Sequence, residues 1–210
     1  MSKQAVNPQQ LKKNRKVILA IFGIPTVIIL LSTVVYYLVE TRTIDLGTVN
    51  NGELVVPPLR FTDLPLLAIN GEAFDYSKPE PKWAFVIIGN RYCTGFCEKM
   101  LYIARQSNIG LAKKMHRARL IFVTTDGAIS EDLRQRFDRE YRGIDIVTLR
   151  RDLIQSLFAD VELNPFQENT FFVVDPSGWL MMYYQIENIE QESLNTLGKA
   201  VLNDMRRLIK

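Results

Sequence analysis

The chain has 210 residues, enough for one domain of ordinary size with an appendage, and its 47% hydrophobic and 23% charged residues are typical of a globular protein rather than a disordered one. The formal net charge of +3 is unevenly distributed, because residues 1–16 carry five positive charges and no acid, and the rest of the chain sums to about −2. No basic stripe is interleaved with aromatic residues, so we expect no nucleic-acid partner.

The first predicted element is an apolar helix at residues 17–39, VILAIFGIPTVIILLSTVVYYLV, which contains no charged residue. At about 1.5 Å rise per residue it would reach roughly 34 Å, enough to cross a hydrocarbon core of about 30 Å. The alternative is a cleaved signal peptide, but the run is longer than a typical apolar signal region and no A-x-A cleavage site follows it. The sequence therefore predicts a single transmembrane helix.

The charges beside this helix predict its orientation. Residues 1–16 form a basic tail, whereas the other flank carries Glu40, Arg42 and Asp45 in a balanced mixture. Because the basic flank of a membrane helix stays in the cytoplasm, we expect a cytoplasmic tail and a C-terminal domain across the membrane. In a bacterial inner membrane that domain lies in the periplasm, where a cysteine pair can be oxidised.

Residues 40–58 are polar and turn-rich, which predicts a linker between the membrane helix and a domain at residues 59–210. The domain is predicted to open with a short hairpin that turns at Asn70-Gly71. Three apolar runs of the kind found in buried strands follow. They occupy residues 82–89, 119–126 and 144–150.

Segments with helical spacing of apolar residues separate these strands. One begins at Cys97 and is interrupted near residues 108–110. Two more follow Ser130 and Asp152, and each of these polar residues is a candidate helix cap.

A second hairpin and a last helix are predicted at the C-terminus. The hairpin covers residues 170–185, with its turn at 175–178. Asn188 and Gln191 resemble a capping box before the final helix. The alternation of strands and helices predicts an α/β fold, with a mainly parallel sheet covered by helices on both faces and a C-terminal hairpin and helix.

Cys93 and Cys97, the only two cysteines, lie in NRYCTGFCEKM at the junction of the first core strand and its helix, which predicts a thioredoxin-like layout. If the helix begins near Cys93, the two sulfur atoms share one face and can form a disulfide or hold a soft metal such as Cu(I). The helix N-terminus and Arg91 favour the Cys93 thiolate, so Cys93 is the expected attacking thiol and Cys97 the more buried, resolving one. A purely structural disulfide, or two inert core residues, would also be compatible with this pattern.

The order of elements, the membrane helix, the C-x-x-x-C motif after an apolar strand and the FFVVDPSGWL hairpin resemble the Sco/SenC family over residues 59–210. The resemblance is strongest to small Sco-like membrane proteins associated with bacterial cytochrome oxidase assembly. It implies a membrane-tethered thioredoxin-fold protein that helps to assemble the copper centre of cytochrome c oxidase. Cys93 and Cys97 match the family's copper-binding or redox cysteines, and Asp126 resembles its strand-end aspartate.

The family's third copper ligand does not carry over to this chain. Sco proteins place a histidine before the final hairpin, but residues 167–169 are Gln, Glu and Asn, and Glu98 stands where the family has a proline. His116, the only histidine, is expected at the surface and far from the cysteines. Met100 is a candidate third sulfur ligand with Cys93 and Cys97, although core filling is the commoner role of such a methionine. Copper is therefore a candidate cofactor.

We predict an inner-membrane, Sco-like assembly factor for a cytochrome c oxidase. In this hypothesis Cys93 and Cys97 are the catalytic pair of a thiol–disulfide oxidoreductase whose partner is an oxidase subunit or another assembly factor. Glu98 and Glu168 are candidate proton-transfer groups near the thiols. The competing hypotheses are a non-catalytic binding module or scaffold, a Cu(I)-binding chaperone, and general thiol–disulfide exchange on exported proteins.

Overall fold

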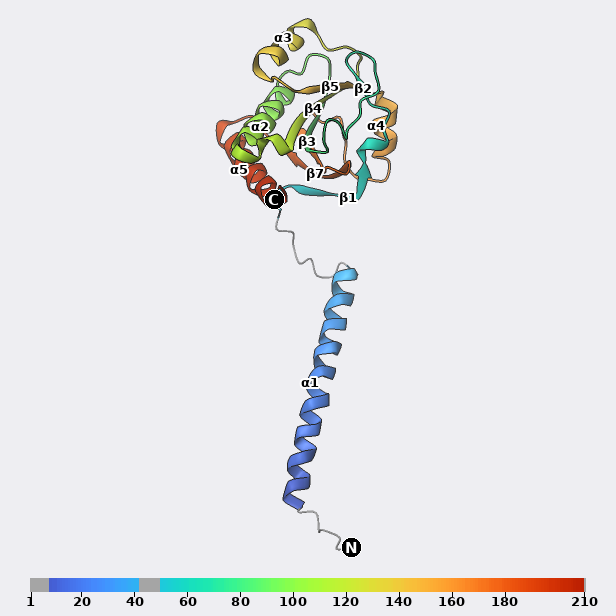
Figure 1. Ribbon diagram of the computed structural model, residues 1–210, viewed down its shortest axis with the longest axis vertical. Helices are drawn as coiled ribbons and strands as arrows, with labels where there is room; N and C mark the ends of the chain where they lie inside the picture. The colour runs from blue at the N-terminus through green and yellow to red at the C-terminus, as the bar shows by residue number, and fades with distance from the viewer. Residues whose placement is uncertain (1–7, 42–49, 210) are drawn as a thin grey trace. The chain divides into compact units, whose positions relative to one another are not determined.

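The structure, a computed structural model, describes residues 8–41 and 50–209, with side chains from residue 14 onward in the first range (Figure 1). The chain divides into two compact units, residues 1–49 and 50–210. Of the predicted tail and linker, residues 1–7 and 42–49 lie outside the described residues.

A seven-stranded sheet forms the second unit, in the order β1-β7-β6-β3-β4-β5-β2. Its strands are β1 Glu53–Arg60, β2 Leu67–Ala68, β3 Trp83–Gly89, β4 Ala118–Thr124, β5 Asp145–Thr148, β6 Thr170–Val174 and β7 Trp179–Gln185. The pairs β3–β4 and β4–β5 are parallel, and the other pairs in this sheet are antiparallel. The thioredoxin-like α/β fold is confirmed, but the sheet is mixed rather than mainly parallel, because the C-terminal hairpin joins it antiparallel to β3.

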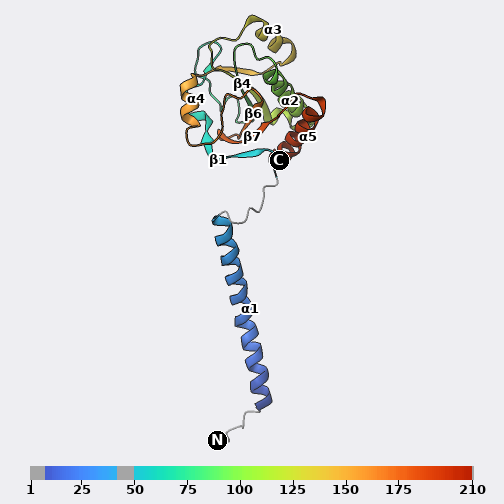
Figure 2. The same ribbon diagram turned by 180° about the vertical axis from the view of Figure 1, so that it is seen from behind.

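Helices cover both faces of the sheet, as predicted. They are α2 Phe96–Gly110, α3 Glu131–Glu140, α4 Arg151–Leu157 and α5 Gln191–Leu208, with 3₁₀ segments η1 Phe61–Asp63 and η2 Ala112–Arg117. In both ribbon views α4 lies on the opposite side of the sheet from α2 and α5 (Figure 2). Successive strand residues point to opposite faces, so Phe85 packs with the α2, α3 and α5 side chains while Val86 packs with η1 and α4.

The predicted linker is wrong at its C-terminal end, because residues 53–58 belong to strand β1. This edge strand pairs with β7, with a register irregularity between Leu54 and Leu59. Pro57 and Pro58, which suggested a linker, are tolerated there because an edge strand leaves one side of its backbone unpaired. Val55 and Leu59 are buried, so the strand belongs to the core.

One of the three predicted helix caps is confirmed. The Ser130 hydroxyl accepts a hydrogen bond from the Leu133 backbone N–H at the start of α3. Asp152 does not cap α4, because its carboxylate is hydrogen-bonded to the Arg150 side chain. Asn188 accepts from the backbone N–H of Glu190 instead of forming a capping box at α5.

The two predicted turns are confirmed. Gly71 has φ +83°, which favours glycine, and Leu67 bridges Ala73 across that turn. The Ala68 backbone N–H also donates to the Glu72 carbonyl and the Phe74 N–H to the Leu66 carbonyl, and β2 pairs with β5 as well. At the second turn the Gly178 backbone N–H donates to the Asp175 carbonyl, and β6 pairs with β7 as expected.

A buried carboxylate fixes the start of the second unit. Asp204 on α5 is 2% exposed and accepts hydrogen bonds from both nitrogens of Asn51, from the Gly52 backbone N–H and from the Tyr184 hydroxyl, at 2.7–3.0 Å. A buried carboxylate needs such partners, because burial removes the water that otherwise solvates it. The segment that enters β1 is therefore held against α5 and β7.

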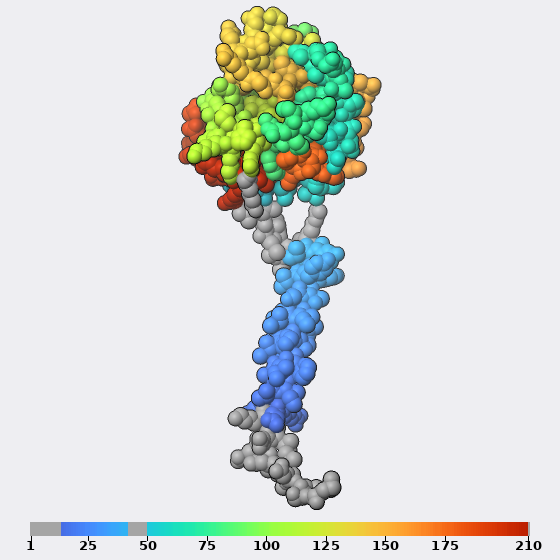
Figure 3. Space-filling model, viewed as in Figure 1, coloured from blue at the N-terminus to red at the C-terminus, as the bar shows by residue number. Residues whose placement is uncertain are grey.

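The first unit is the helix α1, Pro8–Glu40, which contains the predicted span at residues 17–39. Between Asn14 and Glu40 it is long and apolar enough to cross a membrane. None of the residues in its most apolar stretch is buried, and the helix is drawn in blue in Figure 3. The helix begins at Pro8, so residues 8–16 of the predicted tail are helical, and Pro25 lies within it.

Candidate functional site

The candidate site is the loop at residues 90–95, between the end of β3 and the start of α2. The Asn90 side-chain oxygen accepts hydrogen bonds from the backbone N–H groups of Tyr92 and Cys93, at 2.8 and 3.0 Å. Cys93 then adopts φ +43° and Gly95 φ +62°, both in the left-handed region. These turns direct the chain from the strand into the helix and bring Cys93 back toward its first turn.

A disulfide joins Cys93 to Cys97, with 2.00 Å between the sulfur atoms and 5.1 Å between the Cα atoms. The predicted proximity of the two sulfurs is therefore confirmed. The helix begins at Phe96, close to Cys97 where the helical spacing was predicted to begin, so the condition that it begins near Cys93 is not met and α2 contains Cys97 alone. Cys93 reaches its partner through the turned loop instead.

The predicted difference in burial between the two cysteines is also wrong. The exposed fraction of each is 0%, and both belong to the core cluster between the sheet and α2. Cys93 is enclosed because its left-handed turn directs it toward the sheet rather than toward solvent. An attacking molecule would reach the disulfide only after the loop moves.

Gly89, the last residue of β3, makes room for the disulfide. A Cβ atom at this position would lie 2.9 Å from the Cys97 sulfur and 2.8 Å from the Phe122 ring, closer than real Cβ contacts allow. Sequence reasoning missed this requirement. A glycine that ends an apolar strand just before the cysteine motif was the available signal.

A second loop lies against the cysteine loop. The Asn90 side-chain nitrogen donates to Oε1 of Glu168 at 2.6 Å. This is the loop in which the Sco/SenC resemblance predicts a histidine, and here its Glu168 contacts the cysteine loop instead. Asn90 was not expected to be a site residue, since side-chain hydrogen bonds across two loops leave no periodic signal in a sequence.

The charged residues near the motif have other partners. The Arg91 guanidinium lies over the Tyr92 ring at 5.5 Å, and Glu98 forms an ion pair with Arg136 at 3.3 Å. Asp126 follows β4 and accepts a weak hydrogen bond from the Thr125 hydroxyl at 3.3 Å. Arg91 is thus engaged by an exposed aromatic ring rather than by the Cys93 sulfur.

Met100 and His116 lie in different parts of the molecule. Met100, on α2, is fully buried in the cluster that contains both cysteines. His116 is exposed on η2 and lines a pocket with Lys82, which precedes β3. Because the cysteine loop follows the other end of β3, the predicted separation of His116 from the cysteines is confirmed.

Among the described residues, no group of three or more histidine, cysteine, aspartate or glutamate side chains is arranged to hold a metal ion. The sulfur atoms of Cys93, Cys97 and Met100 are soft donors of the kind that Cu(I) prefers. Cys93 and Cys97 are joined in a disulfide, which supplies no thiolate ligand until it is reduced.

Known proteins with this fold include members of the Sco family. Residues 83–210 match the family described as "Transmembrane-like, thioredoxin-like, C-terminal domain". The solution structure of apo Sco1 from Thermus thermophilus is similar at 16% identity and a TM-score of 0.52, covering 77% of this chain and 99% of that one. Yeast Sco1 with copper bound is similar at 16% identity and a TM-score of 0.51, covering 76% of this chain and 95% of that one. No curated protein matches the sequence.

Proposed function

Because the chain belongs to the family of transmembrane-like, thioredoxin-like C-terminal domains, we propose that it is a membrane-anchored thiol–disulfide exchange factor for a respiratory cytochrome c oxidase. The observation that carries the redox part is the Cys93–Cys97 disulfide at the strand-to-helix junction of a thioredoxin-like domain. The oxidase as target is supported by the resemblance to the Sco/SenC family, whose members share this fold.

The proposed reaction is an exchange between this disulfide and two thiols of the target. A target thiolate attacks one cysteine sulfur, which forms a mixed disulfide and releases the other cysteine as a thiolate. A second target thiolate then attacks the target sulfur of the mixed disulfide. The target becomes a disulfide, while Cys93 and Cys97 receive its two electrons and two protons. The reverse sequence reduces the target.

Burial of the disulfide makes loop opening part of this proposal. Side-chain hydrogen bonds from Asn90 hold the loop closed, one of them to Glu168. The Arg91 carbonyl also accepts a hydrogen bond from the Ser130 backbone N–H at the start of α3, so opening of the loop at residues 90–95 must break this bond as well as those of Asn90. Cys93 lies in this loop whereas Cys97 is fixed in α2, so we propose Cys93 as the sulfur that the target reaches first.

The membrane anchor and its orientation are further parts of the proposal. The apolar helix α1 is long enough to cross a bilayer, and the five positive charges of residues 1–16 favour a cytoplasmic N-terminus. The thioredoxin-like domain would then lie in the periplasm of a bacterial cell. Modification of its lysines in intact spheroplasts by a membrane-impermeant amine reagent would support this orientation, and protection from the reagent would contradict it.

A double variant, Cys93→Ala/Cys97→Ala, tests the redox function. Alanine is preferable to serine, because both positions are fully buried and serine would bury two hydroxyl groups. We expect oxidase activity to be lost in cells that express the variant at the normal level. Thiol trapping should also find the wild-type pair both oxidised and reduced.

In the reducing direction, the single variant Cys97→Ala should accumulate a mixed disulfide, because the Cys93 thiolate attacks a target disulfide, releases one target thiolate, and no Cys97 sulfur remains to resolve the product. The matched control is Ser107→Ala, a small buried position on the same helix. Normal oxidase activity in the double variant, together with no trapped complex, would contradict the redox function.

The same outcome would support the second candidate, a non-catalytic scaffold for an oxidase subunit or assembly factor. Complete burial of Cys93 and Cys97 favours this candidate, since a buried disulfide is typical of a structural element. Its closed loop contains few residues, however, so the expected gain in stability from chain entropy is small. The complementation experiment separates the two functions without knowledge of the target.

Copper binding is the third candidate, supported by the copper-bound yeast Sco1 structure. After reduction, Cys93, Cys97 and Met100 would supply soft sulfur ligands, but the described loop at residues 167–169 offers no imidazole. The residues present do not complete the family's ligand set, so no step of the proposed exchange passes through copper. Cu(I) titration of the reduced protein against a chelator, with the double alanine variant as control, tests this candidate.

A further inference from the structure

The pocket lined by His116 and Lys82 lies at the opposite end of the strands from the disulfide. It has a volume of about 600 Å³, within the usual range for small-molecule sites. Its walls include Lys82, just before β3, and Ala118 and Arg119, the first residues of β4. β3 and β4 are parallel, so their carboxyl ends lie together at the opposite edge of the sheet, where the cysteine loop follows β3. We call this cavity the basal pocket.

Most charged side chains that line the basal pocket are cationic. They are Lys82, Arg105, Arg119, Arg139 and Arg142, beside the imidazole of His116 and a single carboxylate, Glu140. Glu80 and Asp145, close by, neutralise Lys82 and Arg119 in ion pairs at 3.1 and 3.5 Å. The excess positive charge is therefore contributed by the other three arginines.

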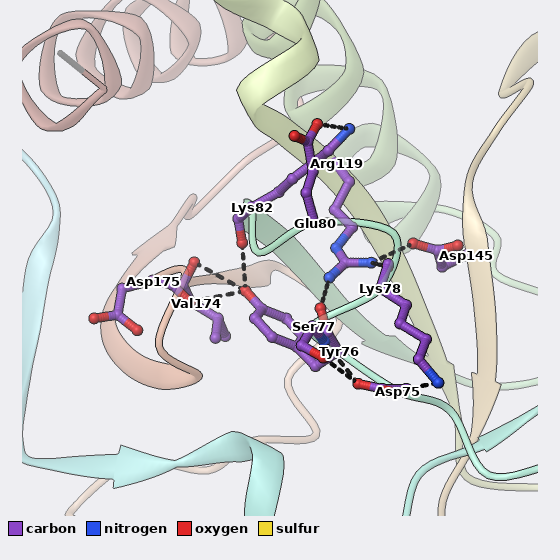
Figure 4. Close-up of polar contacts among 10 residues, drawn as sticks. All are labelled: Asp75, Tyr76, Ser77, Lys78, Glu80, Lys82, Arg119, Asp145, Val174 and Asp175. Carbon is purple, nitrogen blue, oxygen red and sulfur yellow. Dashed lines mark hydrogen bonds and ion pairs between the residues drawn. The ribbon is translucent and has the colours of Figure 1, made fainter.

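Arg119 lines the pocket and is held in place by several polar contacts. Its side chain is only 10% exposed, and its guanidinium donates to the carbonyls of Tyr76 and Lys78 while it pairs with Asp145 (Figure 4). The Tyr76 hydroxyl is held in turn by the carbonyls of Lys82 and Asp175. These contacts leave one buried atom, Nε of Arg119, without a hydrogen-bond partner among the described residues.

A second buried polar atom in the pocket lining is unpartnered within the described part of the chain, Oδ1 of Asn108. Both atoms are inaccessible to solvent, so they lie behind the pocket surface and a ligand in the pocket would contact other groups. Tyr141 also belongs to this lining, and burial raises the pKa of its hydroxyl to about 12. It therefore stays neutral and able to donate a hydrogen bond at physiological pH.

The remaining wall of the pocket is apolar. Ile109 and Met115 are 45% and 47% exposed, and Leu120 and Ile144 lie deeper in the lining. Exposed apolar side chains beside a cationic rim are what an amphiphilic ligand requires. Neither a simple anion nor a purely apolar molecule would use both parts.

We propose that the basal pocket binds a phosphate monoester with an apolar body, the phosphate contacting Arg105, Arg139 and Arg142 and the apolar body contacting Ile109 and Met115. Three separate guanidinium groups suit the three terminal oxygens of a phosphate, whereas a carboxylate can be held by one. The phosphate belongs either to a lipid headgroup or to a soluble ester, and the chemistry of recognition is the same.

Binding of hexyl phosphate to the full-length protein tests this proposal. The protein is placed in phosphatidylcholine nanodiscs, and ligand binding is measured by equilibrium dialysis against empty nanodiscs. We expect hexyl phosphate to bind at least about tenfold more tightly than inorganic phosphate or hexanol, because each of these lacks one half of the recognised chemistry. Equal binding of the three compounds would overturn the proposal.

Variants test the two walls separately. Arg139→Ala/Arg142→Ala should weaken hexyl phosphate binding about tenfold, whereas Arg134→Ala, an exposed arginine of α3 outside the pocket, should not change it. Ile109→Ala/Met115→Ala should weaken hexyl phosphate about fivefold without affecting inorganic phosphate. Undiminished binding in the arginine double variant would overturn the assignment of the site.

Two further arms identify the source of the ligand and separate this inference from the proposed redox function. If the natural ligand is a lipid, phosphatidic acid in the nanodiscs will compete with hexyl phosphate, and if it is a soluble ester, it will not. The variant Cys93→Ala/Cys97→Ala should bind hexyl phosphate normally, since the disulfide is at the other end of the strands. Loss of binding in that variant would contradict an independent site.

Discussion

The two ends of the central strands differ in almost every physical property. At the carboxyl ends, a covalent bond between two sulfur atoms is sealed in an apolar core and closed by a few hydrogen bonds from Asn90. At the amino ends, Arg119 and its ion pair with Asp145 hold together an open pocket with a cationic rim. The disulfide at the carboxyl ends is buried and must be exposed before it can react, whereas the cationic side chains of the basal pocket are already accessible to solvent.

Access and reactivity are therefore set by separate parts of the fold. β3 and β4 run between the two ends. The left-handed turn at Cys93 precedes the buried disulfide at one end, and residues of η2 line the basal pocket at the other. Perturbing one end should leave the other intact. Four substitutions test the contacts that shape the two ends, in order of decreasing effect.

The largest effect is expected from Arg119→Met. This change removes hydrogen bonds to two carbonyls and leaves Asp145 partly buried without its cation, so we expect the free energy of unfolding to fall by about 3 kcal/mol. Urea unfolding followed by tryptophan fluorescence measures it. The control Arg150→Met removes an exposed ion pair and should leave the unfolding midpoint unchanged. Equal midpoints for the two variants would show that Arg119 does not organise the basal end.

Gly89→Ala should cost about 2 kcal/mol of stability at the opposite end. The new methyl group would overlap the Cys97 sulfur and the Phe122 ring, and overpacking of this kind forces backbone shifts. The matched control is Gly198→Ala, whose Cβ atom would lie 3.8 Å from Ile103. Since Gly198 is inside α5, alanine there should raise stability by about 0.5–1 kcal/mol. A Gly89→Ala protein as stable as wild type would contradict the close packing around the disulfide.

Asn90→Ala should lower stability by about 1 kcal/mol, because the loop loses its side-chain hydrogen bonds. The sharper measurement is the rate of disulfide reduction by a phosphine, which should rise several-fold as the loop opens more often. Asn70→Ala is the control, since Asn70 also bonds a backbone N–H two residues later but lies far along the chain from the disulfide. An unchanged reduction rate would mean that Asn90 does not limit access to the disulfide.

The smallest effect is a change in pH dependence at the basal end. Burial raises the pKa of Asp145 above its ordinary value of 3.8, although Arg119 and Lys82 partly oppose the shift. The folded state therefore retains this proton to a higher pH than the unfolded state does. The stability linked to protonation is fully present below about 3.8 and is lost as the pH rises through the folded-state pKa.

Asp145→Asn removes this titration. The free energy of unfolding of the wild type, minus that of the variant, should fall as the pH rises just above 3.8 and then stay constant. Urea titrations at a series of pH values from about 3.5 to about 7 measure this difference. A difference that rises with pH would mean that the ion pair with Arg119 outweighs burial.

Several features could be predicted from local sequence because their cause is local. The uncharged run at residues 17–39 requires a helix wherever water is absent, and it lies within α1. The Ser130 hydroxyl caps α3 by accepting from Leu133, three residues later. The Gly178 backbone N–H closes the hairpin turn by donating to Asp175, three residues earlier. The sulfur atoms of Cys93 and Cys97 were correctly predicted to lie within bonding reach, but the shared helix face behind that prediction does not exist, because Cys93 precedes α2.

Other features depend on residues far apart in the chain. The proline-containing segment at residues 53–58 became a strand only because β7 was there to pair with it. Nothing in the local sequence distinguishes Asp204 from an acid on a helix surface. It can be buried because Asn51, 153 positions away, donates hydrogen bonds to its carboxylate. No periodic pattern records such pairings, since they depend on which elements the folded chain brings together.

Local sequence was thus sufficient to establish the apolar helix, the alternating α/β elements and the position of the cysteine motif, because each follows from patterns within a few turns of chain. The equal burial of Cys93 and Cys97, and the gathering of cationic side chains from separate elements around one cavity, became apparent only in the folded molecule. Burial and cavity shape arise where surfaces from distant segments meet, and that meeting is fixed by long-range packing rather than by local propensity.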